Sequence, residues 1–127
     1  MKIISISLNQ KNVDEIGGIQ KEWGLSSFSE AIRASVRETK KTIEEESKIS
    51  GKIFALLIVR HSHETEKFLS TLKHEFQKVI QSQSHNCIFD DQCLDVFLVK
   101  GDAEKIKKFK NSVVGNNKIQ KVKLVVL

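Results

Sequence analysis

Four candidate metal ligands lie close together in the second half of the chain. His85, Cys87 and Cys93 fall within nine positions, and His74 lies eleven residues before His85. If residues 84–88 form a strand, side chains alternate between its faces, so His85 and Cys87 project from the same face. Five residues separate the two cysteines, which suits a hairpin loop leading into a neighbouring strand that starts at Cys93. The spacing therefore predicts that three ligands converge on one metal ion.

His74 is expected to reach such a site from another subunit. In the helix predicted at about residues 64–76, it lies two residues from both Leu72 and Phe76, about 200° round the helix from these core residues. Its side chain therefore points away from its own sheet, and it cannot easily reach the other three ligands of its own chain if they face the other way. We therefore predict a site with two histidines and two cysteines that is shared between subunits.

Other interpretations of these residues need no metal. Taken singly, His74 is typical of a surface histidine, and either cysteine is typical of a small buried hydrophobic residue. A redox switch that joins Cys87 to Cys93 across the hairpin is a second alternative. His61 and His63 form a separate His-x-His pair near the start of a helix. We expect this pair to be exposed to solvent, with an auxiliary or transient metal position as the alternative.

The elements that would position the ligands follow the order β-α-β-β-α-β. Alternation and helical periodicity predict strands at 53–60, 79–88, 93–100 and 119–127, and helices at about 64–76 and 103–114. This order describes a ferredoxin-like fold, in which an antiparallel sheet carries both helices on one face. A charge run that ends in Ser50 and Gly51 marks the expected boundary between a domain at 1–48 and a domain at 52–127. The predicted fold class is α+β.

The first domain shows a different pattern. Residues 2–8 alternate as one short strand, which is unstable alone and is expected to pair with its copy from a second chain. Asn9 can cap a following helix, and Gly24 can end it. Ser27 and Glu30 form a capping box at the start of a long charged helix. The apolar residues expected to face inward in the first helix are Val13, Ile16, Ile19 and Trp23. In the second helix, Ile32, Val36 and Ile43 recur at helical spacing.

Strand, helix, turn and capped helix make the ribbon-helix-helix plan, which predicts DNA binding. In this plan two chains pair their strands into a ribbon that enters the major groove. Ile3, Ser5 and Ser7 would face the groove, because the other side of the strand is needed for the core. The helix start, with Ser27 and Ser29, offers N–H groups and a positive dipole end to a DNA phosphate. A dimerisation module with no DNA role is the alternative.

Composition and the absence of certain motifs bear on nucleic-acid binding, membrane insertion and catalysis. The chain has 127 residues, a formal net charge of +5 and a pI near 9.3, which is compatible with a nucleic-acid partner. No apolar run approaches the roughly 18 residues of a membrane span, so we expect a cytoplasmic protein whose cysteines stay reduced. No phosphate loop or nucleophile motif is present, and four protein ligands would leave no open metal position. We therefore predict no enzyme activity.

The whole chain, residues 2–127, resembles the nickel-responsive regulators. The resemblance is strongest in SEAIR (29–33), and in DQCL (91–94) running to KGD (100–102). That family joins a ribbon-helix-helix domain to an ACT-like domain of ferredoxin fold, and it assembles as a dimer of dimers. Its site takes one histidine from the partner subunit, then a His-x-His pair, then a cysteine. The resemblance implies nickel as cofactor, double-stranded DNA as partner, a homotetramer, and a ligand set of His74, His85, Cys87 and Cys93.

Several positions depart from the family pattern. Cys87 stands where the family has its third histidine, and the resulting pair of thiolates also suits tetrahedral zinc, cobalt or copper(I). Ile3 stands where family ribbons usually carry arginine, Ser5 and Ser7 where they carry threonine, and Ala34 where an aspartate helps to form a cation pocket. The sequence thus predicts a metal-sensing transcriptional repressor. The alternatives are a repressor that senses a small molecule or redox state, and an antitoxin-like interaction module.

Overall fold

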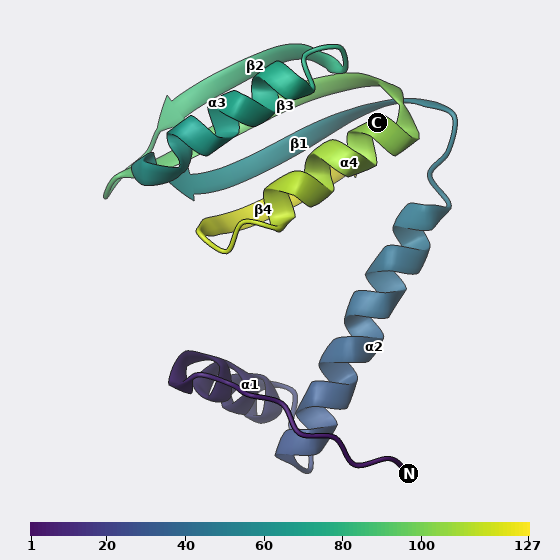
Figure 1. The fold of residues 1–127 in the computed structure, drawn as a ribbon, viewed down its shortest axis with the longest axis vertical. Helices are drawn as coiled ribbons and strands as arrows, with labels where there is room; N and C mark the ends of the chain where they lie inside the picture. Colours follow the sequence, from purple (N-terminus) through teal and green to yellow (C-terminus); the bar gives the residue numbers. More distant parts are fainter. The chain divides into compact units, whose positions relative to one another are not determined.

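The computed structural model describes residues 1–127, and the chain divides into two units, Met1–Lys48 and Ile49–Leu127 (Figure 1). The first unit is helical, and the second combines a sheet with two α-helices and one short 3-10 helix. Each unit follows from the local signals in its own part of the sequence. No helix in the chain is long and apolar enough to cross a membrane.

Both helices of the first unit begin at the capping residues expected from the sequence. Helix α1 spans Gln10–Glu22, and the Asn9 side chain accepts a hydrogen bond from the Asn12 backbone N–H at 2.8 Å. Helix α2 spans Phe28–Ser47, and Ser27 Oγ accepts from the Glu30 N–H at 3.0 Å. Between the helices, Gly24 has a φ of 61°, a left-handed conformation that glycine adopts without steric cost. The predicted N-caps and turn are confirmed, but the Glu30 carboxylate accepts from Arg33 and Arg37, so the capping box is present only in its Ser27 half.

The apolar faces of the first unit are only partly covered within one chain. Ile16 and Ile19 are half-buried, as expected, but Val13 and Trp23 are exposed, so the prediction that all four face inward was wrong for these two. Val36 and Ile43 of α2 are each 61 % exposed. Two helices cannot cover each other on all sides, so these side chains lack a partner surface in a single chain.

Residues 1–9 contain no strand in the single chain. All of them are exposed, including Ile4 at 72 % and Ile6 at 64 %. A strand is defined by hydrogen bonds to a neighbour, and no other segment of the first unit is extended. The expected strand at residues 2–8 therefore does not form without a second chain.

The second unit has the predicted β-α-β-β-α-β order. Its strands are β1 (Lys52–Ser62), β2 (Ile80–Cys87), β3 (Gln92–Asp102) and β4 (Ile119–Val126), and its helices are η1 (His63–Thr65), α3 (Glu66–Glu75) and α4 (Ala103–Val114). The strands form one antiparallel sheet in the order β2-β3-β1-β4, as a ferredoxin-like fold requires. Helices α3 and α4 both lie on one face of this sheet (Figure 1).

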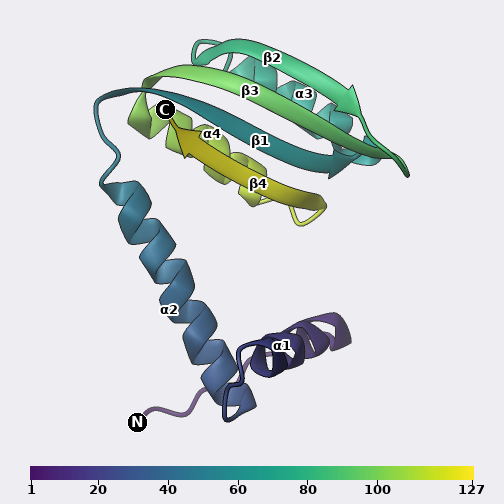
Figure 2. The same ribbon diagram turned by 180° about the vertical axis from the view of Figure 1, so that it is seen from behind.

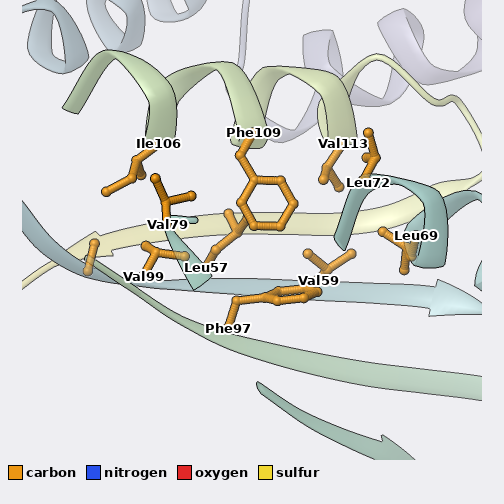
Figure 3. Close-up of a cluster of buried hydrophobic side chains, with 11 residues drawn as sticks. Leu57, Val59, Leu69, Leu72, Val79, Phe97, Val99, Ile106, Phe109 and Val113 are labelled. Carbon is orange, nitrogen blue, oxygen red and sulfur yellow. The ribbon is translucent and has the colours of Figure 1, made fainter. Parts of the chain in front are cut away.

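The core lies between that face and the two helices. Phe109 of α4 meets the edge of Phe97 on β3, with ring centroids 5.2 Å apart (Figure 3). Phe109 also stacks on Phe76, with ring centroids 5.0 Å apart. Alternate residues of the central strand, Ala55, Leu57 and Val59, are fully buried beneath these rings. Because strand side chains alternate, the next residue in this series on β1 is His61, which must lie on the same covered face.

Helices α3 and α4 leave the opposite face of the sheet uncovered (Figure 2), and apolar side chains lie on that face. Leu56 pairs with Leu98 and Ile58 pairs with Val96 across β1 and β3, and all four are only half-buried. Leu94 continues the patch along β3 and is also half-buried. We call Leu56, Ile58, Leu94, Val96 and Leu98 the open sheet face. Such a contiguous apolar area is typical of a surface that contacts another protein chain.

Candidate metal centre

The hairpin between β2 and β3 brings together three of the four predicted ligands. Cys87 is directly opposite Cys93 in the register, and His85 is opposite Asp95. The turn is tight because Asp90 and Asp91 adopt positive φ angles of 55° and 57°, and the Ile88 N–H donates to the Gln92 carbonyl at 2.8 Å. The hairpin that the cysteine spacing predicted is therefore present, and it sets His85, Cys87 and Cys93 on one face.

One ligand atom from each of His85, Cys87 and Cys93 lies within 4.8 Å of the others. Both cysteines are free thiols; Cys93 is buried, whereas Cys87 is exposed. The cluster lies on the helix-covered face of the sheet, because Cys93 belongs to the buried alternation of β3. The side chain of His85 is 31 % exposed, and its ring completes a group of one nitrogen and two sulfur atoms.

His74 is not part of this cluster within one chain. It lies in the last turn of α3, it is exposed, and the group of neighbouring ligand atoms does not include it. The prediction of a shared site assumed that the three ligands face away from α3, but they face the side of the sheet that α3 covers. His74 nevertheless lies outside their cluster within a single chain.

Asp95 holds the imidazole of His85. One carboxylate oxygen, Oδ1, makes a short contact with Nδ1 of His85, and the other, Oδ2, lies 3.3 Å from Nε2 of His61 and 3.8 Å from Nζ of Lys73. Asp95 is only 1 % exposed. A carboxylate bound to one ring nitrogen directs the other nitrogen of a histidine toward a metal, and it raises the basicity of that nitrogen. Asp95 is thus placed to orient His85.

His61 is completely buried, so the expectation that it is exposed was wrong. It occupies the next inward position of β1 after Val59, and the alternation of that strand could have indicated this. Its Nδ1 lies 2.9 Å from the Ser62 carbonyl, which can only accept, so Nδ1 carries a hydrogen. Its other ring nitrogen, Nε2, lies 3.3 Å from Oδ2 of Asp95, and both atoms are buried.

His63 and Glu66 lie beside the three clustered ligands. Nδ1 of His63 is 3.9 Å from Sγ of Cys93 and 3.5 Å from Oε2 of Glu66. The other carboxylate oxygen of Glu66 is 3.4 Å from Nε2 of His85. The side chain of His63 is 67 % exposed, so the expectation of a solvent-exposed residue is confirmed for this histidine. The glutamate thus bridges two imidazoles at the open side of the cluster.

The chemistry of the donor set fits a transition metal. Burial raises the pKa of the Cys93 thiol, with a smaller effect from the nearby Cys87, so the metal-free chain keeps this sulfur protonated at neutral pH. A metal ion must displace that proton, and metal affinity should therefore rise with pH. Thiolate and imidazole ligands select transition metals over magnesium or calcium. Three ligands from one chain leave one position of a four-coordinate ion to be filled.

Comparison with known proteins shows the family of this chain. A family model described as the NikR C-terminal nickel binding domain matches residues 54–127, a range that contains His74 and all three clustered ligands. This chain belongs to the nickel-responsive regulator family. Three curated relatives named "Putative nickel-responsive regulator", from Methanococcus vannielii, Methanococcus maripaludis and Methanocaldococcus jannaschii, are 32 %, 33 % and 30 % identical to it. Each alignment covers 100 % of this chain and 92 % of the relative.

A solved structure supports the fold of this nickel-responsive regulator. The uncharacterized protein TM1266 from Thermotoga maritima superposes with a TM-score of 0.56 at 18 % sequence identity. The superposition covers 61 % of this chain and 99 % of the other. At this identity the likeness concerns the fold alone.

Proposed function

We propose that this chain is a metal-responsive, DNA-binding transcriptional repressor that acts in the cytoplasm. It senses nickel or another transition metal at a site formed by His85, Cys87 and Cys93 of one chain and the partner's His74. The observation that carries this proposal is the convergence of three ligand atoms within 4.8 Å in a domain of the nickel-binding family. The three-ligand cluster needs a fourth donor, and His74 is an exposed imidazole on a helix surface.

The identity of the metal depends on Cys87. Family membership favours nickel, and two sulfur with two nitrogen ligands can surround a square-planar nickel ion. The same set also suits tetrahedral zinc, cobalt or copper(I). A redox sensor is the second candidate function, because Cys87 and Cys93 are opposite each other in the sheet register and both are free thiols.

The surfaces of both units support assembly from several copies. The open sheet face of the second unit is apolar and half-buried, which suits contact with another copy of residues 52–127. In the first unit, a groove of about 510 Å³ between the helices is lined by Ile16, Ile32, Val36 and Ile43, among others. A second first unit placed against this groove would cover the exposed apolar side chains. The resulting assembly is a tetramer, a dimer of dimers.

DNA binding is assigned to the first unit. Residues 2–8 alternate and are exposed, so they are free to pair with a second copy as a two-stranded ribbon. Ile3, Ser5 and Ser7 would then face the major groove. Ser27 and Ser29 stand at the first turn of α2, where backbone N–H groups suit a DNA phosphate. Metal binding between second units would bias how the two ribbons are placed on their half-sites.

Metal content tests the function directly. Protein purified without chelator should contain nickel, zinc, cobalt or copper, and metal should change its affinity for an operator selected from random DNA. Linkage requires that DNA changes metal affinity by the same factor. Metal-free protein that binds its operator equally well with and without added metal would contradict the sensor role. An effect of oxidation alone would favour the redox candidate.

Replacing both ribbon serines tests the DNA-reading surface. A Ser5→Ala/Ser7→Ala double variant should lose about 1 kcal/mol of sequence discrimination per lost base contact, the lower end of the usual range. Its fold and salt-dependent non-specific binding should persist, because phosphate contacts supply most of that affinity. Competition gel shifts measure both properties. Ser112→Ala, the same change on an exposed position of α4, is the matched control. Unchanged discrimination in the double variant would remove the ribbon from sequence reading.

Substitutions of Cys87 test the two-thiolate site. In cobalt-loaded protein, Cys87→Ser should lower the sulfur-to-metal charge-transfer absorption to that of one thiolate and weaken cobalt binding by about tenfold or more. Cys87→His should create a set of three histidines and one cysteine and shift the preference toward nickel. Absorption titrations with cobalt(II) and nickel(II) report both effects. If Cys87→Ser binds each metal as the parent does, Cys87 is not a ligand.

A further inference from the structure

The open side of the three-ligand cluster is occupied by a histidine of the same chain. His63 stands at the start of η1, and its backbone N–H donates to the Asp91 carbonyl at 3.1 Å. Asp91 belongs to the turn between β2 and β3, the hairpin that carries Cys87 and Cys93. The backbone of His63 is therefore tied to the hairpin, while its exposed side chain keeps the freedom to rotate over the cluster.

The distance from His63 to Cys93 is close to the separation of two ligands on one metal ion. Zinc binds sulfur at about 2.3 Å and imidazole nitrogen at about 2.0–2.1 Å, so at a tetrahedral angle these atoms are about 3.6 Å apart. Nδ1 of His63 and Sγ of Cys93 are 3.9 Å apart. A shift of a few tenths of an ångström gives the separation from Cys93 that zinc requires. Rotation of the exposed His63 side chain must also bring Nδ1 toward the ligand atoms of His85 and Cys87, because His63 lies outside the three-ligand cluster in the metal-free chain.

Glu66 contributes to this arrangement without being the best ligand. Its two carboxylate oxygens lie 3.5 Å from Nδ1 of His63 and 3.4 Å from Nε2 of His85, so it contacts both imidazoles. The carboxylate also adds negative charge at the side where a cation would enter. Two thiolates and two imidazoles form the set typical of tetrahedral zinc, which favours His63 over Glu66 as the fourth donor.

We propose that His63 is an intrachain fourth ligand, so that His63, His85, Cys87 and Cys93 of one chain hold a tetrahedral ion such as zinc(II) or cobalt(II). This inference rests on the proposed metal site, because it uses three of the same ligands. It adds that this site does not need the partner's His74 when the ion is tetrahedral. A chain could then take up metal before it assembles, through the exposed imidazole of His63.

The test uses cobalt(II) titration of the full-length chain in a His74→Ala background, which removes the partner's ligand. This single variant should keep the intense visible bands of four-coordinate cobalt and the charge transfer of two thiolates. Adding His63→Ala should weaken cobalt binding by about tenfold or more and reduce the visible bands. Adding Glu64→Ala, an exposed neighbour in η1, is the matched control and should change neither property. Circular dichroism of each variant checks the fold.

Three other outcomes would contradict either the intrachain ligand or the metal site itself. If His74→Ala alone abolishes the four-coordinate spectrum, only the partner completes the site, and the intrachain ligand is rejected. If His63→Ala has no effect in that background but Glu66→Gln does, the fourth donor is the carboxylate, and His63 is again rejected. If Cys93→Ala in the otherwise unchanged chain leaves cobalt binding intact, the proposed metal site itself fails, whatever the result for His63.

Discussion

A Cys93→Ala chain should bind nickel(II) on the order of 100-fold more weakly than the parent. Structural metal sites with four protein ligands contribute about 10–16 kcal/mol, or roughly 3 kcal/mol for each ligand, and 1.4 kcal/mol corresponds to a tenfold change. Cys93 is buried at the centre of the cluster, so water cannot easily replace its sulfur. Competition titration against a chelator of known nickel affinity measures the loss. The same titration with a Cys93→Ser chain separates loss of the thiolate from loss of volume.

Mixing chains tests whether the nickel site is shared. Chains with His74→Ala and chains with Cys93→Ala each lack a different ligand, so each alone should bind nickel poorly. When they are unfolded together and refolded, hybrid sites can combine the three-ligand cluster of one chain with His74 of the other, and some tight nickel binding should return. A mixture that binds no more nickel than its two components would show that the partner does not supply the fourth ligand.

An Asp95→Ala chain should be about 3–5 kcal/mol less stable than the parent, even without metal. Removing one partner of a buried charged group leaves the others without compensation, and changes of this kind cost about that much. Asp95 is 1 % exposed, and His61, His85 and Lys73 all contact its carboxylate. Urea unfolding followed by circular dichroism, in the presence of a chelator, measures the free energy of unfolding.

Asp95→Asn tests the charge of this residue separately from its shape, and Asp90→Asn is the matched control. Asp95→Asn keeps the shape and one acceptor, so it should cost less than Asp95→Ala but still weaken metal binding by about 10–100-fold, because His85 loses its orienting carboxylate. Asp90→Asn makes the same chemical change at an exposed turn position with a φ of 55°, which asparagine tolerates, and it should change neither property. A loss below about 1 kcal/mol for Asp95→Ala would mean that the buried charge is not paired as the contacts indicate.

The sequence alone was sufficient for features that depend on local periodicity. The alternation of residues 84–88 and the five-residue spacing between Cys87 and Cys93 predicted the hairpin, and the structure has that hairpin. Asn9 and Gly24 predicted where α1 begins and ends, and Ser27 predicted where α2 begins, because capping involves neighbours in the chain. The order of strands and helices in the second unit followed from the same patterns.

Only the tertiary structure decided which side chains surround the predicted ligands. Asp95, Glu66 and His63 come from three different elements, and no local pattern places them around His85 and Cys93. His61 was expected to be exposed, next to a helix start and beyond a strand predicted at 53–60, but β1 extends to Ser62 and carries it into the core. Its position depends on how far β1 pairs with β3 and β4, which is a long-range property. The strand expected at residues 2–8 is absent from the single chain, because a strand needs a hydrogen-bond partner and the expected partner is a second chain.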